Sequence, residues 1–387
     1  MTAVTLSPPT QVNRVSLARF TAYFLWLGTV GFGGPIALAG HMQQDLVDAR
    51  RWVRKQDYLE GLALAQLAPG PLAAQLAIYL GYIHSGILGA TTIAFAFILP
   101  SFLMVLGLSA AYVRFGGLHW MQGMLYGIGA AVIAIIARSS FKLAKLTLAK
   151  DKLLWAIFAV LAFSTALTSR EIIWLFLLGG LINMLVRAMP TRIPARSMPL
   201  ALLNPAAFSL LGSGSTLFQI FLYFAKAGLF VFGSGLAVVP FLYGGVVQGH
   251  HWLNDQQFVD AVAVAMITPG PVVITVAFIG YLVAGLAGAS VAALGIFLPV
   301  YLVVILLAPS YKRWAKNPQI NAFVRGVTAA ATGAIAGAVL VLARRSLYDV
   351  YTILICLIAL LVLFRWKLPE PILIGASALA GLLLHHS

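Results

Sequence analysis

Long apolar runs separated by short polar stretches make up most of this chain. Most runs approach the roughly 20 residues that an α-helix needs to cross a bilayer, whereas a β-barrel would show segments of about 10 residues with alternating polarity. The pattern predicts an all-α polytopic membrane protein with about 12–13 membrane segments, some of them broken helices. The runs cover residues 18–40, 58–83, 86–112, 121–140, 153–168, 171–186, 199–216, 218–245, 258–283, 286–308, 320–343, 349–364 and 370–385.

Two homologous halves match when the sequence is shifted by 200 or 199 residues. Chance similarity between apolar stretches would align leucines and alanines, not tryptophans, prolines and glycines in one register. We predict a cytoplasmic N-terminal tail (1–19), a first transporter repeat (20–187), a linker with or without a short membrane segment (188–217), and a second repeat (218–387). Matched positions include Gly28 and Gly228, Trp52 and Trp252, Pro69 and Pro269, Gly81 and Gly280, and Pro100 and Pro299.

Loop charges indicate that the two repeats are inverted. The 138–152 connection is strongly basic, whereas its counterpart at 344–349 has two arginines; the 113–120 connection has one arginine, whereas 309–318 has three basic residues. Basic residues are enriched in cytoplasmic loops. Equivalent loops of the two halves therefore lie on opposite sides of the membrane. Repeats of this kind are typical of secondary transporters, whose substrate site lies at the repeat interface near the bilayer midplane.

The amino-acid composition excludes some classes of protein function. Hydrophobic residues make up 61% of the chain and charged residues 9%, against about 25% charged residues in a soluble domain, which excludes an ordinary water-soluble enzyme. The net charge of +15 fits the positive-inside bias of a membrane protein rather than nucleic-acid binding. The acidic residues lie in or beside polar connections, with Glu60 and Asp260 at the mouths of apolar segments. The interior therefore suits an anion, and a carboxylate for proton coupling is expected only at these two positions.

The first apolar run contains Gly31-Phe32-Gly33-Gly34-Pro35, and the equivalent place in the second half contains Phe232-Gly233-Ser234-Gly235. Glycines beside a proline predict a helix broken within the membrane, whose freed backbone groups must be buried in protein or line a cavity. The helix that resumes would present N–H groups carrying about half a positive charge, which bind anions. The alternative is that these glycines only allow close helix packing.

The second run of each half contains Pro69-Gly70-Pro71 or Pro269-Gly270-Pro271, which predicts another break near mid-depth. Polar neighbours could donate hydrogen bonds to a bound oxyanion, and the alternative is a purely structural kink. The neighbours are Gln66 and Gln75 in the first half and Thr268 and Thr275 in the second.

Two further features carry charge. The 41–57 connection is basic, and we interpret it either as an interfacial segment anchored by Trp52 or as a vestibule that concentrates anions. Lys226 lies within an apolar run, and we expect it to be buried and to neutralise part of a substrate charge; the alternative is that it snorkels to the interface. Motifs for nucleotide, zinc or nucleophilic chemistry are absent, so we predict no enzyme, cofactor or metal.

The paired glycine motifs, the paired Pro-Gly-Pro sequences and the duplicated halves resemble the chromate ion transporter family, in its long two-domain form. The resemblance covers about residues 20–384 and implies a transporter that exports chromate across the cytoplasmic inner membrane and so confers chromate resistance. It places the functional core at the glycine and Pro-Gly-Pro motifs of both halves. The departure is Ser234-Gly235 where the first half has Gly34-Pro35, so the second break is expected to differ in shape.

Two alternatives to a chromate exporter remain open at the level of sequence. A sulfate or other oxyanion carrier would use the same kind of site, because two tetrahedral dianions of similar size present the same chemistry. An anion channel would share the segments but form a continuous pore. The expected partners are an oxyanion and the lipid bilayer, with no nucleic acid, and homo-oligomer formation is also open.

Overall fold

The computed structural model describes residues 13–32, 34–116, 118–168, 173–188, 215–230, 238–310, 317–366 and 368–384. Every secondary-structure element within these ranges is a helix, which confirms the predicted all-α class. The helices of the first half are α1 (Leu17–Val30), α2 (Gly34–Met42), η1 (Gln43–Ala49), α3 (Lys55–Leu67), α4 (Leu72–Phe115), α5 (His119–Leu148), α6 (Lys152–Thr168) and α7 (Ile173–Arg187).

The second half repeats this order after the 188–217 linker, most of which lies outside the described residues. Its elements are α9 (Thr216–Phe230), α10 (Val238–Tyr243), η4 (Gly244–Gly249), α11 (Asp255–Ile267), η5 (Val272–Ile274), α12 (Thr275–Leu307), η6 (Ala308–Ser310), α14 (Pro318–Ser346), α15 (Val350–Arg365) and α16 (Glu370–Leu384).

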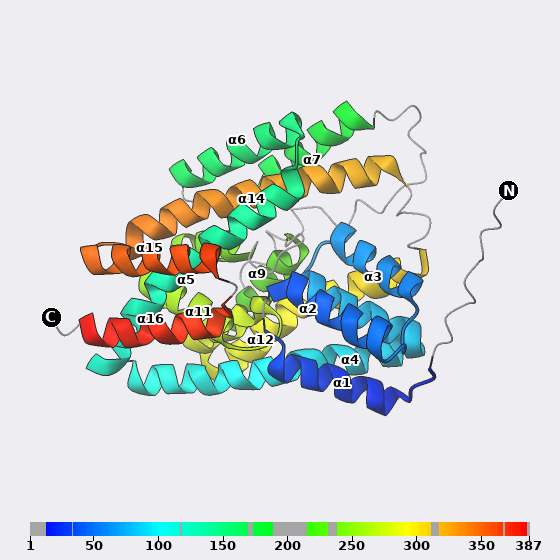
Figure 1. The fold of residues 1–387 in the computed structure, drawn as a ribbon, viewed down its shortest axis with the longest axis horizontal. Coiled ribbons are helices and arrows are strands. Elements are labelled where there is room, and N and C mark those ends of the chain that lie inside the picture. The colour runs from blue at the N-terminus through cyan, green and yellow to red at the C-terminus, as the bar shows by residue number, and fades with distance from the viewer. Residues whose placement is uncertain are drawn as a thin grey trace.

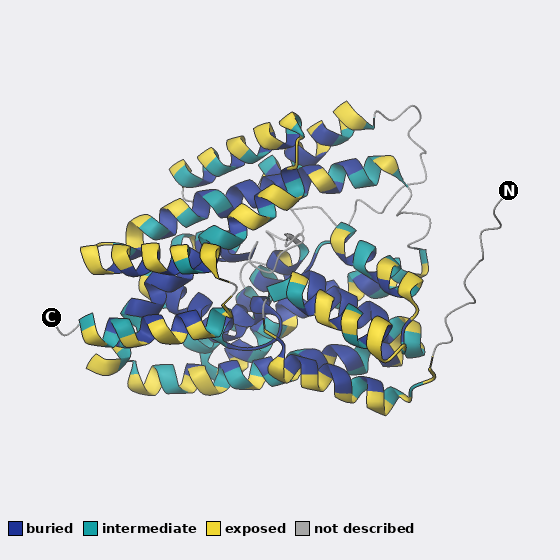
Figure 2. Ribbon diagram, viewed as in Figure 1, coloured by how far each residue is buried: buried dark blue, intermediate teal, exposed yellow. Residues whose placement is uncertain are grey.

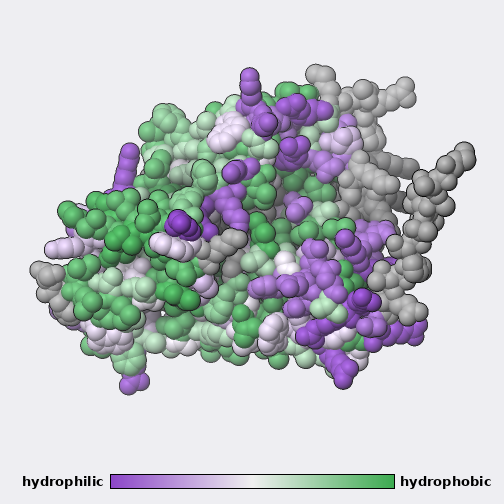
Figure 3. Space-filling model, in the orientation of Figure 1, coloured by the Kyte–Doolittle hydropathy of each residue, from purple (hydrophilic) through white to green (hydrophobic). Residues whose placement is uncertain are grey.

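The outer surface of the bundle is suited to a membrane. Within the described residues, α4, α5, α14 and the continuous stretch from η5 to η6 are long and apolar enough to cross one, and five further apolar helices are shorter. Exposed helix faces carry large hydrophobic side chains such as Leu383, Leu306 and Phe163. Figure 2 shows these exposed faces on the outer helices, and Figure 3 shows hydrophilic side chains gathered over α1 and α3. The protein is therefore a multi-pass membrane protein.

Equivalent helices of the two halves run in opposite directions. Helices α5 and α14 occupy matching places in the repeat and pack against each other. The hydroxyl of Tyr126, near the start of α5, donates a hydrogen bond to Asp349, which lies just beyond the end of α14. Figure 1 shows the same antiparallel course. The halves are thus inverted, as the loop charges predict.

Helix breaks occur where the sequence predicts them. Helix α1 ends at Val30 and α2 begins at Gly34; α3 ends at Leu67 and α4 begins after Pro71. In the second half α11 ends at Ile267, before the second Pro-Gly-Pro sequence. The predicted boundary between the runs 58–83 and 86–112 is a kink inside α4 rather than a loop, and α12 has a matching kink. Three predicted runs, 18–40, 58–83 and 258–283, therefore correspond to interrupted helices, and two predicted boundaries between runs are kinks.

Glycines set the closest helix contacts. A Cβ atom at Gly127 of α5 would overlap the carbonyl of Ser377 and the backbone of Gly381 in α16. The equivalent Gly326 of α14 lies equally close to the backbone of Gly179 and Gly180 in α7. These contacts fix how α14 and α5, the central helices, sit against their outer neighbours.

Replacing Gly127 with alanine should lower the thermal stability of the purified protein, because α5 and α16 must separate to accept one methyl group. Overpacking of this kind costs about 1–3 kcal/mol. The matched control is Gly375→Ala in α16, where the added Cβ meets open space. Equal melting temperatures for the two variants would show that this contact does not hold the helices together.

Candidate functional site

The Pro-Gly-Pro sequence of the second half lies against the first break of the first half. The backbone N–H of Gly270 donates a 2.8 Å hydrogen bond to the carbonyl of Gly31. The hydroxyl of Ser101, directly after Pro100 in α4, donates to the carbonyl of Pro269 (2.7 Å), and the carbonyl of Gly28 lies 3.3 Å from the same oxygen. Three broken or kinked segments from both halves therefore meet at one place.

The first Pro-Gly-Pro turn makes the equivalent contact with the second half. Gly70 lies against Val300, the equivalent of Ser101, and an added Cβ would lie 2.9 Å from its Cγ1. Gly70 and Gly270 have φ angles of 136° and 96°, a region that residues with a Cβ rarely adopt. Each Pro-Gly-Pro turn thus needs glycine for its backbone conformation and for its close approach to the opposite half.

Both Pro-Gly-Pro turns lead into buried helix N-termini. Pro71 is the N-cap of α4 and Pro271 that of η5, and neither N-terminus has a side-chain cap. The first residues that follow are buried in each case, with Ala74 and Val273 fully inaccessible. Buried N-terminal N–H groups without a cap are unusual, and together with the helix dipole they favour a bound anion.

The polar neighbours of the turns make a different contact from the one expected. The Gln75 amide nitrogen donates to the Pro69 carbonyl (2.6 Å), and its buried oxygen has no partner among the described residues. The Thr268 hydroxyl donates back to carbonyls in the last turn of α11, and the Thr275 hydroxyl donates to Val272. These side chains satisfy backbone carbonyls freed by the breaks. Gln66 is exposed on α3 and does not join them.

The first break opens onto free space. Gly31 is buried, Phe32 is 36% exposed, and a Cβ at Gly34 would meet nothing within 4 Å. Within the described part of the chain, the N-terminus of α2, with Pro35 in its first turn, is therefore less closely packed than the turns that contain Gly70 and Gly270. Gly33 and the second-half motif Phe232-Gly233-Ser234-Gly235 lie outside the described residues, so the predicted difference between the two breaks stays a prediction.

Lys226 is exposed on α9, so the expectation that it is buried is wrong. Its position corresponds to Trp26 in α1, which is 52% exposed on the matching face. A continuous apolar run does not reveal which face of a helix a residue occupies. A role for Lys226 in substrate binding stays a prediction.

Asp260 is more deeply placed than the sequence indicates. It is 1% exposed in α11 and accepts hydrogen bonds from the Tyr112 hydroxyl of the other half (2.8 Å) and from Gln256 (2.9 Å). The ion pairs found among the described residues do not include it. The first residues of α11 are polar, so the sequence indicates that Asp260 lies at the edge of a polar connection rather than inside a buried helix. The available sequence signal was the spacing of Gln256 and Asp260 by four residues, which places both on one helix face.

Replacing Ser101 with alanine should lower the free energy of unfolding by about 1–3 kcal/mol, because the carbonyl of Pro269 would be buried without its hydrogen-bond donor. The control is Ser109→Ala in the same helix. Ser109 is equally buried, but its hydroxyl donates only to Val105 one turn earlier. Thermal unfolding of both variants measures the difference; equal losses would mean that Ser101 does not link the halves.

Comparisons with known proteins agree with this architecture. A family model described as "Chromate transporter" matches residues 18–184 and again 218–382. The "Chromate transport protein" of Cupriavidus metallidurans is 59% identical over 380 residues, which is 96% of this chain and 95% of the relative. The "Probable chromate transport protein" of Synechococcus elongatus is 55% identical over 381 residues, 95% of each chain.

A more distant relative, the "Chromate transport protein" of Pseudomonas aeruginosa, is 31% identical and covers 96% of this chain and 93% of its own length. No solved structure matches the chain. Since one family model matches both halves and these relatives align over nearly the whole sequence, the protein belongs to the chromate transporter family.

Proposed function

We propose that the protein is a secondary transporter that exports chromate from the cytoplasm across the inner membrane, and that it thereby confers chromate resistance. The observation that supports this most is the pair of buried, uncapped helix N-termini that follow Pro71 and Pro271 at the junction of inverted halves. The relatives named as chromate transport proteins supply the substrate class.

The physics of the site suits a tetrahedral dianion. Moving such an ion out of water is prohibitively costly without compensation. Two helix N-termini each contribute about half a positive charge and several N–H donors. The glycine and proline turns hold them against the opposite half. The oxyanion would bind between the repeats, with N–H groups rather than a lysine or a glutamine as its first donors.

Driving force is available without a second ion. An inside-negative potential favours the exit of anions by about 2.3 kcal/mol per charge per 100 mV, and chromate carries two charges. Asp260 offers the alternative of proton coupling, because a buried carboxylate without a cation partner is the group that transporters use to carry protons. We favour potential-driven export because Asp260 lies in the first half of α11, away from the turn that follows Ile267.

The function is tested by uptake of labelled chromate into inverted vesicles with a set membrane potential, with and without a pH gradient. Potential-driven accumulation that excess sulfate barely inhibits is the expected result. Strong inhibition by sulfate, followed by transport of labelled sulfate itself, would favour a general oxyanion carrier. Fluxes too fast for alternating access would favour an anion channel, and no uptake by folded protein would contradict chromate export.

The binding site is tested by placing a fixed carboxylate at the N-terminus of α4. The variant Ala73→Asp should fold, because a carboxylate in the first turn is favourable, and it should lose chromate uptake by about tenfold or more, because the site is then occupied by like charge. Ala73→Asn is the neutral control of the same shape. Equal uptake by the two variants would place the oxyanion elsewhere.

A further inference from the structure

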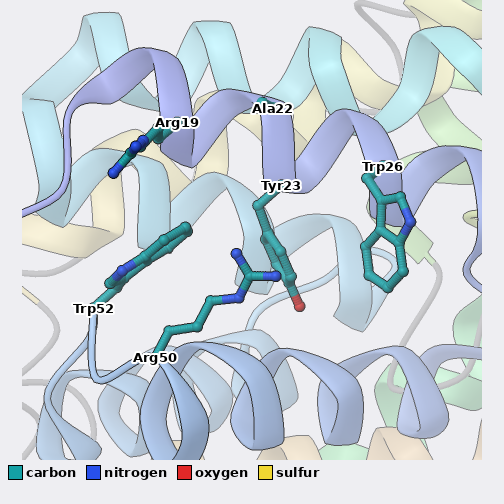
Figure 4. A pocket seen from close by; sticks show the side chains of 6 residues that line it. All are labelled: Arg19, Ala22, Tyr23, Trp26, Arg50 and Trp52. Atoms are coloured by element: carbon teal, nitrogen blue, oxygen red, sulfur yellow. The ribbon is translucent and has the colours of Figure 1, made fainter.

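A basic pocket with aromatic walls lies on the outer side of α1, away from the junction of the halves. Four residues of α1 and two of the segment after η1 enclose a cavity of about 440 Å³. In Figure 4 Arg50 reaches between Trp52 and Tyr23, and Arg19 lies above Trp52. The lining residues are Arg19, Ala22, Tyr23, Trp26, Arg50 and Trp52.

The pocket keeps its positive charge. The Arg50 guanidinium lies 4.8 Å from the ring centroid of Trp52 and 5.4 Å from that of Tyr23. Among the described residues neither Arg19 nor Arg50 forms an ion pair. The carboxylate of Asp45 is nearby and accepts a hydrogen bond from Tyr23 (3.1 Å). Ring stacking holds a guanidinium in place yet leaves the N–H groups at its edge free for an oxyanion.

An apolar strip continues from the pocket along the same helix. The lining residues of α1 follow the spacing of one helix face, and the neighbouring side chains Leu25, Trp26 and Val30 are 46%, 52% and 44% exposed. The opposite face of α1 carries Gly28, which packs against the backbone of Phe97 in α4, and the carbonyl of Gly31, just after α1, accepts a hydrogen bond from the other half. The pocket therefore faces away from the proposed transport site and toward the surroundings of the protein.

We propose that this pocket binds the phosphate group of an anionic phospholipid from the cytoplasmic leaflet, whose acyl chains lie along the exposed strip of α1. The shared chemistry is recognition of a tetrahedral oxyanion by two guanidinium groups. A lipid explains the position at a helix face better than a free ion does, because a free ion gains nothing from the apolar strip. Basic pockets at the cytoplasmic side of membrane helices bind anionic head groups in this way.

The second half keeps two aromatic residues of this pocket, Tyr223 and Trp252, but not its arginines, and Lys226 stands in place of Trp26. His250 stands where the first half has Arg50 and stacks on Trp252 with 4.3 Å between ring centroids. Gln219 stands in place of Arg19. His250 lies in the connection after η4, and its burial lowers its pKa, so the ring carries little positive charge near neutral pH.

Inversion explains this asymmetry. It places the second copy at the opposite membrane surface, while the first is beside the basic residues Arg51, Arg54 and Lys55, which mark the cytoplasmic side. The cytoplasmic leaflet is the one rich in anionic lipid. The pair of arginines is therefore found in the copy that faces such lipids, whereas the second copy has a single lysine, Lys226.

Native mass spectrometry of the full chain, titrated with phosphatidylglycerol or phosphatidylcholine, tests the proposal. Wild-type protein should bind phosphatidylglycerol more tightly than phosphatidylcholine. The double variant Arg19→Gln, Arg50→Gln should bind phosphatidylglycerol about 30-fold more weakly, since each basic side chain near anionic lipid contributes roughly a fivefold factor. Arg50→His, which copies the second half, should show about a fivefold loss and serves if the double variant does not fold.

The matched control is Arg365→Gln, because Arg365 also stacks on a tryptophan, Trp366, at 5.8 Å but does not line this pocket. It should bind phosphatidylglycerol as wild type does. Unchanged affinity in the Arg19 and Arg50 variants, or equal affinity of wild type for the two lipids, would overturn the proposal. Displacement of phosphatidylglycerol by millimolar inorganic phosphate or sulfate would also overturn it, because the pocket would then be a free-anion site.

Discussion

A helix broken inside a membrane must satisfy its freed backbone groups within the protein, and this requirement determines how the two halves of this chain pack together. The hydrogen bond from the Gly270 N–H to the Gly31 carbonyl joins a broken segment of each half, and Ser101 adds a second link through Pro269. Carbonyls are satisfied by these contacts and by Gln75. The N–H groups at the start of α4 and η5 have no side-chain cap, so the junction has a surplus of donors, which is the chemistry of an anion site.

Because the two homologous halves are inverted, each Pro-Gly-Pro turn packs against the equivalent region of the opposite half. Single-residue differences between the halves then make the two junctions chemically different. Val300 replaces Ser101 beside the first Pro-Gly-Pro turn, so only one of the two junctions has a hydroxyl link. His250 replaces Arg50 beside the matching tryptophan, so only one of the two matching connections stacks an arginine on its tryptophan. Asp260 is buried and bonded to Tyr112 across the halves. The two junctions are therefore symmetric in outline and different in their polar groups, and the transport site that we propose there would share this asymmetry.

The sequence predicts the fold class, the duplication and the breaks well, because hydropathy, proline and glycine act on the backbone locally. It predicts side-chain surroundings poorly. Lys226 lies in an apolar run but is exposed, since a run does not show which face is buried. Gln75 and Thr268 bond to backbone carbonyls, which depends on the geometry of the turns. Asp260 follows a polar helix start that resembles a loop, and its partner Tyr112 is 148 residues away, so no local pattern reveals the pair.

We propose that the oxyanion binds at the helix N-termini between the halves, and a structure of the protein with bound selenate would locate it. Selenate is a tetrahedral dianion like chromate, and anomalous scattering from selenium identifies it without ambiguity. We expect selenium beside the backbone of residues 72–74 or 272–274, next to the turns that contain Gly70 and Gly270. Selenium only at Arg19 and Arg50 on the outer face of α1, with none between the halves, would contradict it.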